Sequence, residues 1–84
     1  MRLEFQATAP CWVSAVVDGR KAVARIMRPG EHEMVMIEKE AVVDVGDAAA
    51  FTYTIDGRPG RSLGTSGQVR TLKLTRDTRA QYVR

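Results

Sequence analysis

Hydrophobic and polar residues alternate over short stretches of this chain, and most of these stretches end in a turn-forming sequence. In residues 2–7, the apolar Leu3, Phe5 and Ala7 alternate with polar side chains, and residues 51–55 repeat the pattern. A period of two places one face of a β-strand in the core and leaves the other face in water. Turn signals that recur about every 8–12 residues are typical of an all-β sandwich or barrel.

The alternation and the turn signals together predict about seven strands. These are residues 2–7, 11–17, 21–27, 31–37, 41–45, 51–55 and 68–74. Asp18-Gly19 and Asp56-Gly57 predict tight hairpin turns, because aspartate and glycine tolerate the positive φ angles of a type I′ turn. Pro29-Gly30 predicts a further turn. Residues 48–50 either continue a turn or form a brief helical turn, and residues 58–67 are the longest predicted loop.

These elements predict an all-β fold, a small antiparallel β-sandwich with Ig-like or Greek-key-like connections. With 84 residues the chain forms one domain, near the smallest size that builds a core from packing alone. Its single cysteine, Cys11, excludes an internal disulfide. We expect the sandwich to span residues 3–74. Residues 75–84 are expected to form a C-terminal tail, either a short helical turn or a segment with Tyr82 folded back.

The chain is mildly basic, with a formal net charge of +3 at pH 7. Its basic residues are spread along the sequence, and acidic residues are interleaved through the first half. A groove for single-stranded nucleic acid needs aromatic stacking platforms as well as charge, and aromatic residues make up only 6% of this chain. We therefore expect a solvated surface that binds no nucleic acid. No apolar stretch approaches the ~20 residues of a transmembrane helix, and no signal-peptide core follows Met1.

His32, with Glu31 and Glu33 beside it, is the first candidate for a metal or acid–base site. In a strand, adjacent side chains point to opposite faces, so the two glutamates share a side and His32 faces away. The sequence contains no second histidine. Cys11 is expected to be buried and has no base near it in sequence. The sequence therefore predicts no catalytic, cofactor-binding or metal-binding residue and no enzymatic activity.

Three residues remain as candidate partner contacts: Trp12, Arg58 and Arg61. Trp12 lies in a largely apolar strand, which predicts a place in the core, with partner contact as the alternative. The loop that carries the two arginines lacks both the Gly-Lys-Ser/Thr ending and the following helix of a phosphate-binding P-loop. It is expected to be a flexible connection whose arginines contact an anion or a partner.

Taken in order, several segments resemble the C-terminal domain of RodZ-type proteins. They are "LEFQATAPCWVSAVVDG", "MRPGE", "VVDVGDAAAFTYTIDGRP" and "LGTSGQV". That domain shows a tryptophan-containing strand with a D-G turn, a P-G-E turn, a "V/L-G-N/D-A" step and a closing "L-G-x-x-G-x-V". The resemblance runs from Leu3 to about Leu74. It departs at Asp47 and Asp56, where asparagine is common, but aspartate also tolerates the turn conformation.

This resemblance implies a β-sandwich on the periplasmic side of the bacterial inner membrane, within a single-pass membrane protein. RodZ-type proteins carry a cytoplasmic helix-turn-helix domain that binds the actin-like MreB, followed by one transmembrane helix and a linker. They help to maintain rod shape by coupling the MreB cytoskeleton to peptidoglycan synthesis. The implied function is a non-enzymatic extracytoplasmic interaction domain without a cofactor, whose partners are proteins of the cell-elongation machinery. The resemblance also implies a longer protein, anchored by a segment outside these 84 residues.

Two other functions stay open on the sequence. A small cytosolic β-barrel would bind nucleic acid or anions through its arginines, with an affinity that falls steeply with salt. A cell-wall carbohydrate-binding module would need exposed aromatic residues. Exposure of Trp12 or Tyr53 would therefore favour the carbohydrate-binding module, and burial of both would argue against it.

Overall fold

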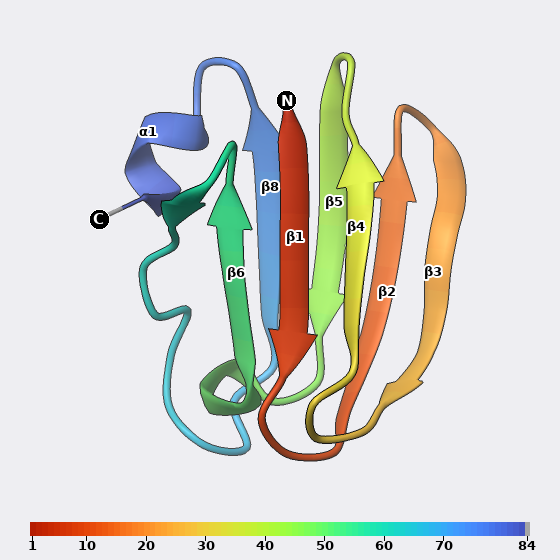
Figure 1. The fold of residues 1–84 in the computed structure, drawn as a ribbon, viewed down its shortest axis with the longest axis vertical. Helices are drawn as coiled ribbons and strands as arrows, with labels where there is room; N and C mark the ends of the chain where they lie inside the picture. Colours follow the sequence, from red (N-terminus) through yellow and green to blue (C-terminus); the bar gives the residue numbers. More distant parts are fainter. Residues whose placement is uncertain (84) are drawn as a thin grey trace.

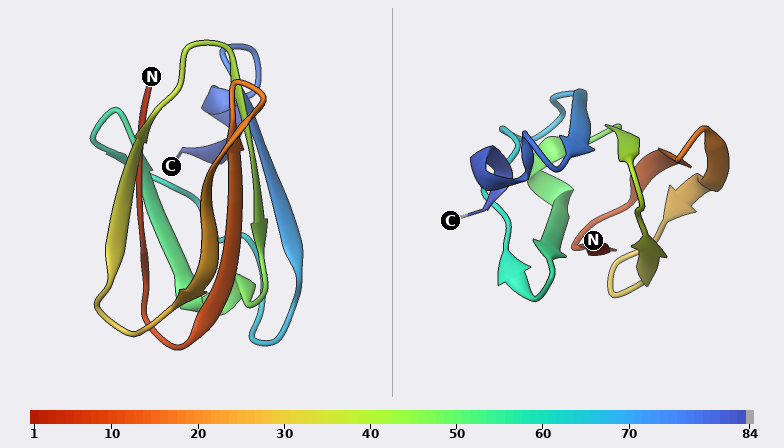
Figure 2. Two further views of the ribbon diagram at one scale, coloured as in Figure 1. Left: turned by 90° about the vertical axis from the view of Figure 1, so that its right-hand side faces the viewer. Right: turned by 90° about the horizontal axis from the view of Figure 1, so that it is seen from above.

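Two antiparallel sheets of four strands each pack face to face in this computed structural model, which describes residues 1–83 (Figures 1 and 2). The β1 sheet has the order β4 (His32–Met36), β1 (Arg2–Ala7), β6 (Phe51–Ile55), β7 (Arg58–Pro59). The β2 sheet has the order β3 (Arg20–Met27), β2 (Cys11–Val17), β5 (Glu40–Val45), β8 (Arg70–Thr75). A 3-10 helix, η1 (Ala48–Ala50), and one helical turn, α1 (Arg79–Tyr82), complete the chain. No helix within residues 1–83 is long and apolar enough to cross a membrane.

The predicted all-β sandwich is confirmed, and each predicted strand is present with its ends within two residues of the prediction. The residues at 48–50 form the brief helical turn that the sequence left as one of two options. The structure adds β7, a two-residue strand at the start of the segment that was predicted to be a loop. This short strand pairs with β6 and becomes one edge of the β1 sheet.

The core lies between the two sheets and is built from the inward-facing half of each alternating strand. On β1 the burial alternates strictly, so Leu3, Phe5 and Ala7 are buried and their neighbours are exposed. Leu72 and Leu74 on β8 are fully buried, as their spacing predicted. No charged or polar side chain within residues 1–83 is buried. Apolar packing therefore holds the sheets together.

The two Asp-Gly hairpins adopt the positive φ angles that the sequence predicts. At the β2–β3 turn, Asp18 has φ 50° and Gly19 has φ 80°. The Asp18 carboxylate also accepts hydrogen bonds from the backbone N–H groups of residues 38, 39 and 40, at 2.7–3.0 Å. One hairpin turn of the β2 sheet is thereby tied to the connection between β4 and β5. These three hydrogen bonds favour the charged form, so the pKa of Asp18 lies below its ordinary value.

Asp18→Asn is expected to destabilise the domain at neutral pH and to lose this effect in acid. Asparagine tolerates the left-handed backbone but offers one acceptor oxygen without charge. Because the folded pKa of Asp18 is depressed, its charge contributes stability above an unfolded pKa of about 4, and this contribution is lost as pH falls through the folded pKa. Urea denaturation of both proteins from pH 7 downwards measures the difference.

Asp77→Asn is the matched control for this pH experiment, because the Asp77 carboxylate makes no hydrogen bond or ion pair within residues 1–83. It should follow the unmodified protein at every pH. A stability gap between Asp18→Asn and the unmodified protein that stayed constant down to the acid limit would contradict the role of the Asp18 charge.

The end of the described chain packs against the edge of the β1 sheet. Val83 forms an antiparallel bridge with Gly60, and the backbone N–H of Arg61 donates to the Tyr82 carbonyl at 2.7 Å. The Tyr53 hydroxyl donates to the same carbonyl at 2.8 Å. The segment 79–83 is therefore held beside the end of β7. Arg84, the last residue of the predicted tail, lies outside the described residues.

Candidate functional site

Glu31 and Glu33 share one partner, Arg25, and His32 lies apart from this contact. The guanidinium of Arg25 on edge strand β3 donates to Glu31 at 3.1 Å and to Glu33 at 2.9 Å, so the glutamates share a side as predicted. These bonds join an edge of one sheet to an edge of the other. They raise the pKa of Arg25, and the pKa of Glu31 is lowered by the Arg28 N–H and by Arg25. His32 lies on the exposed outer face opposite Gln6.

Cys11 is buried, as the sequence predicted, and within residues 1–83 its thiol contacts two backbone carbonyl groups. Its thiol lies 3.6 Å from the carbonyl oxygen of Trp12 and 3.5 Å from that of Asp47, and both groups are acceptors only. Residues 1–83 contain no group of three His, Cys, Asp or Glu side chains arranged to hold a metal ion.

An open groove of about 590 Å³ follows the outer face of the β1 sheet beside the segment after β7. Its lining includes one carboxylate, Glu4, which is paired with Arg2 at 3.2 Å. Burial raises the pKa of Tyr53 to about 12, and its hydroxyl is occupied by the Tyr82 carbonyl. The lining also includes His32, the single histidine of the chain, but Glu4 is the one carboxylate there, so the groove offers no pair of carboxylates for acid–base catalysis.

Trp12 lies on the outer face of the β2 sheet, where 47% of it is exposed, so the prediction that it packs in the core is wrong. On β2 the burial alternates, with Cys11 and Val13 buried on either side of Trp12. The strand is apolar on both faces, which is why its composition suggested a core position. Directly opposite Trp12 on β3 lies Ile26, which is 63% exposed.

A β-bulge creates the pairing of Trp12 with Ile26. Next to the turn, Val17 pairs with Arg20 and Val16 with Lys21, but beyond the irregularity at Ala15/Val16 the register is shifted by one residue. Without that shift, Trp12 would lie opposite Arg25. The extra residue of a bulge changes which side chains face each other and increases the local twist. Sequence reasoning missed Ile26 because a two-residue hairpin predicts the unshifted register.

The exposed apolar surface continues beyond Trp12 across the end of the β2 sheet. The Gly46 N–H donates to the Trp12 carbonyl at 2.8 Å, and a Cβ on Gly46 would lie 3.3 Å from the Trp12 Cβ. Val69 directly precedes β8 and is 69% exposed. Val45 pairs with Arg70, so continuing the β5–β8 register by one residue places Val69 opposite Gly46. We call Ile26, Trp12 and Val69 the apolar row. Three exposed apolar side chains at one end of a sheet form a surface suited to contact with another protein.

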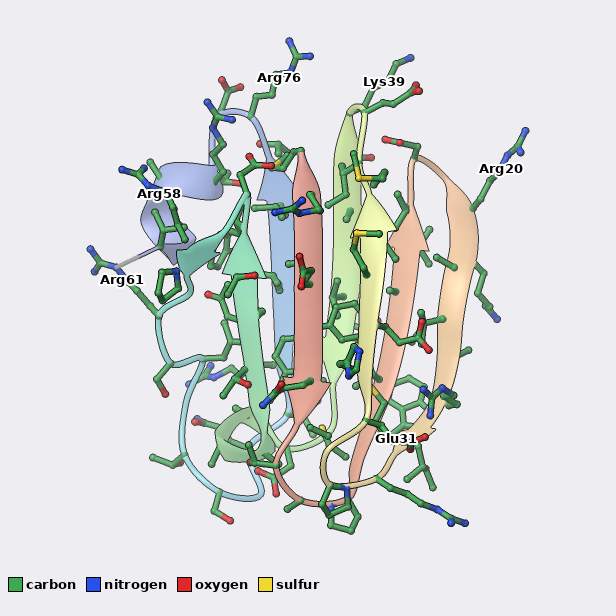
Figure 3. All side chains as sticks on the ribbon, viewed as in Figure 1. Arg20, Glu31, Lys39, Arg58, Arg61 and Arg76 are labelled. Atoms are coloured by element: carbon green, nitrogen blue, oxygen red, sulfur yellow. The ribbon has the colours of Figure 1, made fainter. Side chains whose placement is uncertain are left out.

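Arg58 and Arg61 lie elsewhere, at the β7 edge of the other sheet, so the structure does not bring them together with Trp12. Figure 3 shows both side chains pointing outward from this edge. The Arg61 Nε donates to the Val83 carbonyl at 2.8 Å. The loop after them is anchored, because the Gly67 N–H donates to the Asp47 carboxylate at 3.0 Å.

The short motifs that suggested a family resemblance all have structural roles in the folded domain. Besides Asp18, the Asp47 carboxylate accepts from the Ala49 N–H at the start of η1, and the Asp56 carboxylate accepts from the Arg2 N–H at 2.7 Å. Glu31 accepts from the Arg28 N–H across the Pro29-Gly30 turn at 2.7 Å. Each carboxylate caps a turn, and most of them join segments far apart in the chain.

Comparison with known proteins gave one significant result. The family model described as the RodZ C-terminal domain matches residues 4–73. No curated protein and no solved structure matches the chain significantly.

Proposed function

The chain belongs to the RodZ C-terminal domain family, and on this premise we propose that it is a non-enzymatic interaction domain on the extracytoplasmic side of the bacterial inner membrane. Membership of this family indicates a role in a membrane-associated, RodZ-like cell-shape protein. In the proposal, the domain contacts proteins of the cell-elongation machinery. Segments outside this chain connect it to the MreB cytoskeleton, so that the whole protein links MreB to peptidoglycan synthesis.

The apolar row is the observation that carries this proposal. Trp12 and Ile26 face each other on adjacent strands, and both are exposed although they are among the largest apolar side chains of the domain. Exposing them to water is unfavourable, and tryptophan is among the residues that contribute most when a protein interface forms. The row thus fits the centre of a protein–protein contact.

The surroundings of Trp12 favour a protein partner over nucleic acid or a glycan. A nucleic-acid groove places aromatic platforms beside basic residues, whereas Trp12 and the arginines Arg58 and Arg61 belong to different sheets. Tyr53, the second aromatic residue on which a glycan site would depend, is buried at 5% exposure. The neighbours of Trp12 in the row are the aliphatic Ile26 and Val69 rather than polar groups that would bind sugar hydroxyls.

Trp12→Ala and Ile26→Ser are each expected to weaken binding to an elongation-machinery protein by about 2 kcal/mol, roughly thirtyfold in Kd. The measurement is site-specific photo-crosslinking in a rod-shaped bacterium, with the crosslinker placed at position 26 of the full-length protein and the products identified by mass spectrometry. We expect crosslinks to a component of the elongation machinery, and their loss when Trp12 is also replaced by alanine.

Position 36 provides the matched control, because Met36 is equally exposed at 62% but lies on the outer face of the other sheet. A crosslinker there should give no such product. Crosslinks to the elongation machinery from position 36 and none from position 26 would contradict the assignment of the apolar row. Circular dichroism of each variant shows that the fold is retained.

A further inference from the structure

The charge of this protein is divided unevenly along the chain. Residues 58–83 contain six lysines and arginines and one acidic residue, whereas residues 1–57 contain six basic and nine acidic residues. The small overall charge of +3 therefore conceals a negative first part and a strongly positive later part. Although the basic residues are spread along the sequence, their counts by segment show this division, and the fold shows where the later part lies.

The fold gathers the later part on one flank of the sandwich. β7, β8 and α1 lie on the same side of the molecule, and the edge strands β3 and β4 lie on the other (Figures 1 and 2). Arg58 and Arg61 project outward from this flank, and Arg76 projects from the turn between β8 and α1 (Figure 3). Together with Arg79 on α1, these residues form what we call the basic flank.

Few acidic groups neutralise the basic flank. Within residues 1–83, Arg79 makes the one ion pair of this group, with Asp56 at a separation of 3.8 Å. Arg58, Arg61 and Arg76 make no ion pair among the described residues. A hollow of about 300 Å³ between the β6–β7 turn and α1 has Arg58 and Arg79 in its lining, together with Asp56, the partner of Arg79. Two guanidinium groups thus border a concave surface that is open to solvent.

We infer that the basic flank binds the phosphate groups of anionic phospholipids and holds the domain against the membrane surface. Arginine presents several N–H donors in a planar fork that matches phosphate oxygens. Each basic residue close to an anionic leaflet adds attraction, and the attraction decays within about 8 Å in physiological salt. The inference rests on the proposed function only for the placement of the domain beside a membrane.

The composition of the flank favours a charged surface over a protein partner. The large apolar residues that are exposed within residues 1–83 are Trp12, Ile26, Met34, Met36 and Val69, and none of them belongs to β7 or α1. Protein interfaces usually have an apolar centre inside a polar rim. A patch of arginines without such a centre suits a plane of phosphate groups. Because Trp12 and Ile26 lie on β2 and β3, away from β7 and α1, membrane contact through β7 and α1 leaves these two residues available to a protein.

The test is co-sedimentation of the 84-residue chain with lipid vesicles at low and high salt. We expect binding to vesicles of phosphatidylcholine mixed with phosphatidylglycerol, little binding to phosphatidylcholine alone, and release by salt. Arg58→Glu combined with Arg61→Glu should lower the partition coefficient about tenfold or more. Because Arg61 also supports Val83, a second variant pairs Arg58→Glu with Arg76→Glu, which leaves that hydrogen bond in place. It should show the same loss.

Arg20→Glu combined with Lys21→Glu is the matched control, because it changes the net charge by the same amount on the opposite side of the molecule (Figure 3). It should retain most of the vesicle binding. An equal loss in the control, or no preference for phosphatidylglycerol, would overturn the inference, and so would binding to inorganic polyphosphate without binding to vesicles. None of these results would alter the crosslinks expected from position 26, so the two proposals fail independently.

Discussion

Phe5→Ala is expected to lower the free energy of unfolding by about 3–5 kcal/mol. Phe5 is 2% exposed on β1, which lies between β4 and β6 in its sheet. Its ring packs against Phe51 with the ring centroids 5.4 Å apart. Alanine would leave a cavity between the sheets and remove this aromatic contact. A domain of this size typically has about 4–13 kcal/mol of total stability, so the variant would be close to unfolding at physiological temperature.

Urea denaturation followed by circular dichroism measures this effect. Gln6→Ala is the control, because Gln6 is the next residue on the same strand and lies on the exposed outer face. We expect it to change stability by about 0.5 kcal/mol or less. A cost below about 1 kcal/mol for Phe5→Ala would mean that the two sheets do not pack as described.

Gly60→Ala is expected to destabilise the domain by about 1–3 kcal/mol and to detach the C-terminal segment. A Cβ at this position would overlap the ring of Tyr53, which is buried and therefore has little room to move. The backbone at Gly60 would have to shift. That shift would weaken the 2.8 Å hydrogen bond from the Gly60 N–H to the Tyr53 carbonyl and the bridge to Val83.

Hydrogen exchange distinguishes detachment of this segment from general loss of stability. In Gly60→Ala, the N–H of Arg61, which donates to Tyr82, should exchange faster by a larger factor than amides of the core strands. The control is Gly64→Ala, where the nearest obstacle is the end of the Gln68 side chain, which can move at the cost of its hydrogen bonds from Thr65. We expect Gly64→Ala to lower the free energy of unfolding by at most about 1 kcal/mol. Uniform acceleration over all strands in Gly60→Ala would show that the segment does not open separately.

This segment also connects stability to the inferred membrane contact. α1 carries Arg79, and Arg61 is held by hydrogen bonds to the segment at Tyr82 and Val83. The arrangement of the basic flank thus depends on the close approach of Gly60 to Tyr53. Glycine is required there by space and not by backbone conformation, because its φ is not in the left-handed region.

Most of the secondary structure could be predicted from local patterns. The alternation around Phe5 predicts β1, and the Asp-Gly pairs predict type I′ hairpins, which the φ angles at Asp18 and Asp56 confirm. These features are local: side-chain periodicity and backbone conformational preference depend on residues that are neighbours in sequence. β7 escaped prediction because two residues are too short to show a period, and its pairing depends on contact with β6.

The positions of the candidate surface residues could not be predicted from local sequence patterns. Sequence reasoning named Trp12 but expected it in the core, because an apolar strand gives no sign of which face meets the opposite sheet. One extra residue in the β2–β3 hairpin then placed Ile26 opposite it.

The basic flank could not be predicted from local patterns either, because its arginines are far apart in the sequence. Arg58 and Arg79 are separated by a long loop and all of β8 in sequence, yet they border one hollow. The alternation, the turns and the sandwich class follow from residues close together in the chain, and the sequence determines them. The exposed row and the basic flank arise from register and sheet packing, which bring distant residues together, so only the tertiary structure decides them.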